Sequence, residues 1–140
     1  MIRQRLIAMA ALLLASVGLI LAGASPAQAA DTWEVDYAVD VNWSDTPKEC
    51  QSNTYVSGCV QAYGDMLWVK DNEKDGHRVT LEWSDPSGDR AGQCVNTLGA
   101  DRAWTACNKD FTEGHIIYWS LKYTDSAGVS RTLGGFSTYV

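Results

Sequence analysis

The sequence of 140 residues contains few of the residues and motifs on which enzymes rely. It has two histidines, His77 and His115, and no G-x-S-x-G, H-E-x-x-H or C-x-x-C motif. A glycosidase needs two carboxylates that face each other across a cleft, an arrangement that a sequence cannot show by itself. The sequence therefore predicts a protein that is not an enzyme and that carries no cofactor.

Basic side chains are also scarce. Eleven Lys and Arg residues stand against 17 Asp and Glu residues, which gives a formal net charge of −6. Nucleic acids and anionic membranes attract basic proteins, so we expect neither as a partner. Between residues 31 and 49, six acidic side chains accompany a single base, Lys48. This local concentration of negative charge favours a basic groove on another protein as the binding partner.

A long apolar run occurs only at the start of the chain, at residues 6–22. Arg3 and Arg5 precede it, and a small-x-small sequence typical of signal cleavage sites follows at 27–29. A transmembrane helix could use a run of similar length. The cleavage site and the polar sequence after it instead favour a signal peptide, residues 1–29, that is removed. We therefore expect a secreted, extracellular protein without a membrane anchor.

The chain has four cysteines, and in an exported protein four cysteines predict two disulfides. Three pairings are possible. We favour Cys50–Cys59 and Cys94–Cys107, because both pairs enclose short local loops. A zinc site would require closely spaced cysteines or nearby histidines, and neither is present.

Sustained helical periodicity is absent, and short β-prone runs alternate with turn sequences. The clearest strands are Met66–Lys70, Arg78–Trp83 and Ile116–Thr124, and we expect the first two to form a hairpin. The pattern predicts an all-β fold: a small antiparallel β-sandwich of six to eight strands, with two local disulfides and an extended N-terminal strand. An acidic, aromatic strand and hinge (30–49) would precede the β-sandwich domain (50–140).

The stretch from Trp33 to Trp43 alternates along its whole length, with apolar or aromatic residues at odd positions and mostly acidic or polar residues at even positions. Because a strand sends successive side chains to opposite faces, the stretch has one apolar and one acidic face. One interpretation is an ordinary first strand of the sandwich, with its acids facing water. The other is β-augmentation, in which the strand adds to the sheet edge of a partner or lies in its cleft. Both interpretations hold if one half of the strand pairs within its own chain. The predicted partner-binding residues are Trp33, Val35, Asp36, Tyr37, Val39, Asp40, Val41 and Trp43.

One acidic loop matches part of a calcium-binding motif. Asp71, Glu73, Asp75 and Glu82 fall at positions 1, 3, 5 and 12 of an EF-hand loop, and Gly76 falls at position 6. The flanking sequences predict strands instead of helices, which favours a solvated hairpin turn with a left-handed glycine. The four acidic residues are the calcium candidate of this sequence, and no other metal site is predicted.

The six tryptophans raise a further alternative, a carbohydrate- or cell-wall-binding protein. Trp68, Trp83 and Trp119 alternate as core positions do, which leaves Trp33 and Trp43 for exposure. Another alternative is a secreted hydrolase inhibitor, in which the N-terminal strand or a disulfide loop blocks an active site.

Several short stretches resemble the small secreted two-disulfide β-sandwich proteins of filamentous actinomycetes. They are Tyr63-Gly64-Asp65, Lys70-Asp71, Asp75-Gly76, Trp83, Gly92-Gln93-Cys94 and, most specifically, the run from Ala106 to Gly114, within a resemblance that covers residues 59–121. Some of these proteins resemble the adaptor of umbrella toxin particles, which are secreted antibacterial assemblies. That adaptor is a small β-sandwich that docks on the repeat-bearing spoke of a large toxin chain. Its extended N-terminal segment enters a cleft in a trypsin-like protein that also carries a lectin.

The resemblance implies a non-enzymatic adaptor that links protein components of an extracellular toxin assembly through its N-terminal strand. Its implied partners are a large repeat-bearing toxin chain and a trypsin-like lectin protein.

Overall fold

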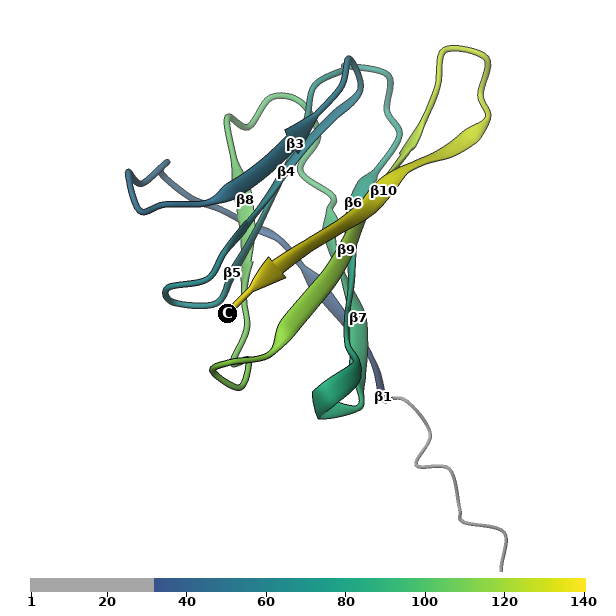
Figure 1. Ribbon diagram of the computed structural model, residues 1–140. Helices are drawn as coiled ribbons and strands as arrows, with labels where there is room; N and C mark the ends of the chain where they lie inside the picture. Colours follow the sequence, from purple (N-terminus) through teal and green to yellow (C-terminus); the bar gives the residue numbers. More distant parts are fainter. Residues whose placement is uncertain (1–31) are drawn as a thin grey trace, which may run out of the picture.

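The computed structural model describes residues 32–140, and the predicted signal peptide lies outside them (Figure 1). The described residues form two five-stranded sheets that pack as a β-sandwich. The predicted all-β sandwich is therefore confirmed. The described residues hold ten strands, more than the predicted six to eight, because the segment before Cys50 supplies two strands and residues 49–52 supply another.

Each of the two sheets has its own spatial order of five strands. The first sheet contains, in spatial order, β1 (Thr32–Tyr37), β7 (Arg90–Asn96), β6 (Val79–Asp85), β9 (Ile116–Thr124) and β10 (Ser130–Tyr139). The second contains β2 (Val39–Asp40), β8 (Thr105–Asn108), β5 (Met66–Asp71), β4 (Val56–Gln61) and β3 (Glu49–Ser52). A short 3₁₀ helix, η1 (Pro86–Gly88), connects β6 to β7. Neighbouring strands pair antiparallel except β1 and β7, which are parallel.

The core lies between the sheets and is built from alternating inward positions. On β6, Val79, Leu81 and Trp83 are buried while the residues between them are partly exposed. Trp68 and Trp119 are also buried, as their spacing predicts. Apolar area removed from water in this way is the main stabilising contribution to the fold.

The predicted hairpin between β5 and β6 is wrong. β5 pairs with β4 and β8 in the second sheet, whereas β6 pairs with β7 and β9 in the first. The polar loop between them crosses from one sheet to the other. Its Gly76 has a φ of 78°, which is positive as predicted. A polar turn between two alternating runs serves a hairpin and a crossover equally well, so the local pattern does not separate them.

Both predicted disulfides are present. Cys94–Cys107 joins β7 to β8 and so connects the two sheets, and Cys50–Cys59 joins directly opposed residues of β3 and β4. The Gly134-Gly135 pair marks a β-bulge in β10: the register with β9 shifts there, and Gly135 has a φ of 90°.

Candidate binding surface on the N-terminal strands

The N-terminal stretch divides between the two sheets. β1 pairs with β7 over six residues, and β2 pairs with β8 over two. Between them Ala38 is buried, and its backbone N–H donates to the carbonyl oxygen of Val95 at 2.9 Å. Figure 1 shows the chain passing from the side of β7 to the side of β8. Residues 32–40 are thus edge strands of this sandwich, and both halves pair within the chain.

The apolar side of the stretch faces outward. Trp33, Val35, Tyr37 and Val39 are between 46% and 63% exposed. We call these four residues the outer stripe. The acidic positions between them, Glu34 and Asp36, turn toward Lys109, and Asp36 binds this lysine while its side chain remains 38% exposed to water. The outer stripe is therefore a row of exposed apolar side chains on an edge of the sandwich.

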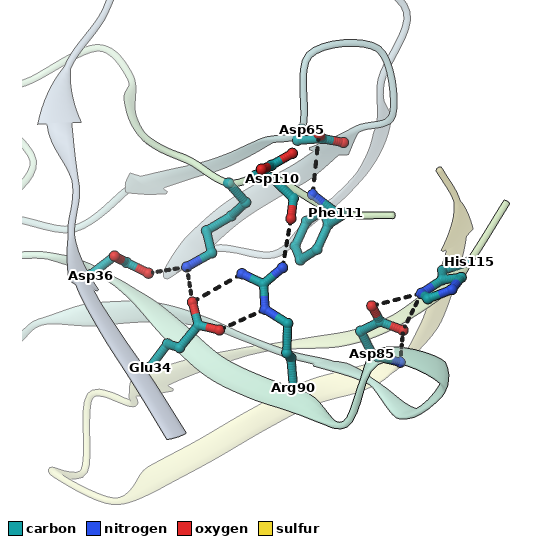
Figure 2. Close-up of polar contacts among 10 residues, drawn as sticks. Glu34, Asp36, Asp65, Asp85, Arg90, Asp110, Phe111 and His115 are labelled. Atoms are coloured by element: carbon teal, nitrogen blue, oxygen red, sulfur yellow. Dashed lines mark hydrogen bonds and ion pairs between the residues drawn. The ribbon is translucent and has the colours of Figure 1, made fainter. Parts of the chain in front are cut away.

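A network of ion pairs holds the acidic side of β1 (Figure 2). Lys109 Nζ lies 2.6 Å from Glu34 Oε2 and 2.6 Å from Asp36 Oδ2. Arg90 donates to both oxygens of Glu34, at 2.8 and 3.2 Å, and to the carbonyl oxygen of Asp110. The Lys109 side chain is only 5% exposed and its ammonium lies 4.9 Å from the Trp83 ring centroid. Charge-assisted bonds of this kind, partly shielded from water, fix the orientation of β1.

The electrostatics of Glu34 reflect this network. The bond from Arg90 lowers the pKa of Glu34 from 4.5 to about 2, against the opposing effect of burial and with a further contribution from Lys109. Glu34 is therefore ionised at any pH near neutrality, and the ion pairs that hold β1 persist there.

Tight backbone packing adds to this attachment. A Cβ atom on Gly92 of β7 would overlap the carbonyl oxygen of Glu34, so a side chain at this position would push β1 off the sheet.

Asp40 on β2 also has its counter-charge within the chain. Its carboxylate accepts a hydrogen bond from Arg102 at 2.9 Å, and both side chains are about half exposed. Glu34, Asp36 and Asp40 are thus all paired with bases that lie at residue 90 or later. These three of the six acids between residues 31 and 49 therefore have counter-charges within the chain.

The end of the stretch packs on the second sheet. Val41 is partly buried against the cluster that contains Trp68, and the Trp43 ring lies 4.7 Å from the Trp104 ring and 5.5 Å from the Trp68 ring. Lys48 lies over Trp43 and Trp68, at 4.4 and 4.7 Å from their centroids. Burial lowers the pKa of Lys48.

The loop between β2 and β3 is closed by the same lysine. Lys48 Nζ donates to the carbonyl oxygens of Ser44 and Thr46, each at 2.7 Å. The hydrogen bonds of Lys48 thus close the predicted hinge on itself, and its contact with the Trp68 ring attaches the hinge to the second sheet.

The free edge of β1 offers backbone hydrogen bonds. Because the N–H of Ala38 points to β7 and strand residues alternate in direction, we infer that the backbone groups of residues 33, 35 and 37 point away from the sheet. An edge strand with unpaired backbone groups is a template for another strand. The outer stripe and the open edge therefore occur on the same residues.

Beside Trp33, the outer face of the first sheet is hollowed. The hollow has a volume of about 360 Å³, and its lining includes Trp33, Tyr118, Ser84, Ser120 and Gly135. Small side chains and the bulge in β10 leave the space, so Trp33 is accessible from this side as well as from the edge.

The calcium candidates do not converge. Asp71 accepts a hydrogen bond from the backbone N–H of Glu73 at 3.0 Å, and Asp75 accepts one from the N–H two residues later at 2.8 Å. Glu82 lies on β6 and pairs with Lys122 at 2.7 Å. Within residues 32–140, no group of three or more His, Cys, Asp or Glu side chains is arranged to hold a metal ion. The carboxylates of the loop stabilise its turns.

Sequence reasoning missed the residues that position β1. Lys109 lies within the Ala106–Gly114 run that carries the resemblance, but neither it nor Arg90 belongs to a periodic pattern. It also missed the contact of His115 with the buried Asp85, whose oxygens lie 2.9 and 3.0 Å from Nδ1 (Figure 2). Asp85 also accepts from the N–H of Gly88, so this pair fastens β9 to the end of β6.

Comparison of the chain with protein-family models, with curated proteins and with solved structures gave no match. Within the part of the chain that the structure describes, no helix is long and apolar enough to cross a membrane.

Proposed function

We propose that this protein is a secreted binding module that acts as an adaptor between other extracellular proteins, and that the outer stripe is its principal contact. The observation that carries the proposal is the orientation of β1, which turns its apolar side chains outward and its acidic side chains toward the body of the protein. Four successive outward positions are apolar and about half exposed or more, while the ion pairs beneath them hold the strand in place.

Residue type and rigidity both support a protein partner. Exposed apolar patches of this kind mark interaction sites on soluble proteins, and Trp and Tyr are the residues that most often anchor interfaces. Because the strand is already ordered by pairing with β7, binding does not have to order it, which reduces the entropic cost of association. Two disulfides are consistent with an oxidising, extracellular environment.

The proposed mode is addition of a partner strand to the open edge of β1. Main-chain hydrogen bonds would give affinity, and the outer stripe would give specificity. This differs from the mode that the toxin-adaptor resemblance implies, in which an extended segment enters a cleft. Such entry would break six residue pairs with β7 and the contacts of Lys109 and Arg90. In the proposed adaptor the strand stays in its own sheet.

The partners that the resemblance suggests are a large repeat-bearing toxin chain and a trypsin-like lectin protein. An adaptor must hold two different chains, so we assign the outer stripe to one of them and leave the other to a separate face of the sandwich.

The test is affinity capture of secreted proteins from the native culture supernatant by immobilised residues 30–140, followed by mass spectrometry. The wild-type protein is compared with Trp33→Ser/Tyr37→Ser and with the control Tyr63→Ser/Val129→Ser, which removes two exposed apolar side chains elsewhere. We expect the first variant to lose one captured chain that the control retains. Equal capture by all three proteins would show that the outer stripe is not the contact.

A further inference from the structure

A second hollow lies at one end of the sandwich, between the loop that joins β5 to β6 and the loop that joins β7 to β8. It has a volume of about 360 Å³ and is lined by residues of 71–78 and 96–101. No residue of the outer stripe lines it. Two of its lining residues are polar, almost completely buried and incompletely bonded, which distinguishes it from an ordinary surface depression.

The first of these residues is Asp71, which is 3% exposed. One of its oxygens accepts the backbone N–H of Glu73, and the structure gives the other no hydrogen-bond or ion-pair partner within residues 32–140. Burial raises the pKa of this carboxyl group. Asp71 thus offers an unused acceptor at the wall of the hollow.

The second is Asn96, which is 1% exposed. Its Oδ1 accepts the backbone N–H groups of Leu98 and Gly99, at 2.8 and 3.1 Å, which fixes the orientation of the amide. Its Nδ2 has no hydrogen-bond partner within the described residues. Native proteins seldom leave a buried donor unpaired, so this group calls for an acceptor supplied from outside the chain.

The charge of the lining indicates the class of ligand. Three acids (Asp71, Glu73 and Asp101) and two bases (Lys74 and Arg78) line it, and this mixture of signs favours neither a strong anion nor a strong cation. Leu98 lines the same hollow and is 42% exposed, which adds an apolar contact. An acceptor, a donor and an apolar side chain around a hollow of mixed charge suit a neutral molecule that carries several hydroxyl groups.

We propose that this hollow binds a neutral saccharide. One sugar hydroxyl donates to the free oxygen of Asp71, and a neighbouring hydroxyl oxygen accepts from Asn96 Nδ2. A hydroxyl group serves both roles without carrying charge, which a carboxylate or an ammonium does not. The C–H face of the ring packs on Leu98. This site is independent of the contact that we propose for the outer stripe.

The experiment is an NMR titration of the ¹⁵N-labelled chain of residues 30–140. The probes are the methyl glycosides of glucose, galactose, mannose and N-acetylglucosamine, each added separately, with calcium chloride as a further probe. We expect at least one glycoside to shift the side-chain NH₂ signal of Asn96 and the backbone amides of 71–78 and 96–101 together and to saturation.

Three variants make the result specific. Asp71→Asn keeps the shape and the acceptor for Glu73 but removes the charged acceptor, and we expect it to weaken the glycoside at least about tenfold. Glu113→Gln removes an exposed acid that lies outside the lining and is expected to leave the affinity unchanged. Leu98→Ser changes a surface side chain without disturbing the core, and it should also weaken binding.

The proposal is overturned if none of the four glycosides gives saturable shifts. It is also overturned if Asp71→Asn and Glu113→Gln act alike, or if calcium alone shifts these amides. In the last case the loop holds a cation.

Discussion

β1 and β6 have the same alternation of residue types but opposite orientations in the sandwich. On β6 the apolar residues Val79, Leu81 and Trp83 face the core. On β1 the acids Glu34 and Asp36 face the body, and the apolar residues face out. The difference arises from what lies opposite: β6 faces apolar strands of the second sheet, whereas β1 lies at the edge, where Lys109 and Arg90 supply charge. An amphipathic strand buries whichever face finds a complementary partner.

The largest expected effect on stability comes from comparing Leu81→Ala on β6 with Val35→Ala on β1. Leu81 is fully buried, so its truncation should cost about 2–5 kcal/mol of the free energy of unfolding. Val35 is an outward residue of β1, so its truncation should change stability by less than about 0.5 kcal/mol. Urea denaturation followed by tryptophan fluorescence measures both. Similar losses in the two variants would mean that β1 buries its apolar face after all.

A somewhat smaller effect is expected from Lys109→Met. The change leaves Glu34 with Arg90 alone and Asp36 without its partner, and we expect a loss of about 3 kcal/mol because the lysine is nearly buried. The matched control is Lys122→Met, which breaks a more exposed pair with Glu82 and should cost less than about 1 kcal/mol. Denaturant unfolding gives the free energy of unfolding of both variants. Equal losses of this free energy would refute the buried network.

The smallest of these effects is the pH dependence that Glu34 gives to the stability of the fold. Because its folded pKa of about 2 lies below the ordinary value of 4.5, ionised Glu34 stabilises the fold above pH 4.5, and this contribution disappears as the pH falls toward 2. Its side chain is 28% exposed, so solvent screening reduces the contribution to about 2 kcal/mol. Stability measured from pH 7 to pH 2 should fall less steeply for Glu34→Gln than for the wild-type protein. Parallel curves would exclude this role for Glu34.

Much of the fold was predictable because its causes are local. The alternation of residues 78–83 and 116–124 predicted core strands, and the short loops favoured both disulfides. The β5–β6 hairpin failed because two strands that follow each other in the chain can face each other across a core instead of pairing.

The candidate surface was predictable only in part. The alternation identified Trp33, Val35, Tyr37 and Val39 as one face of a strand, and they do share the outward face. The acids at 36 and 40 were expected to contact a partner or water, but they bind Lys109 and Arg102 of the same chain. These pairs join residues more than 60 positions apart, a distance over which sequence patterns carry no information on contacts.

The sequence by itself determined that this chain forms amphipathic strands and that these stack into a sandwich, and it favoured the cysteine pairs that enclose short loops. These properties follow from side-chain periodicity and short-range loop closure. Only the tertiary structure decided that the N-terminal stretch divides between two sheets at Ala38 and turns its aromatic side outward. That choice depends on Lys109, which folding brings beneath Glu34 and Asp36 from 75 and 73 residues away.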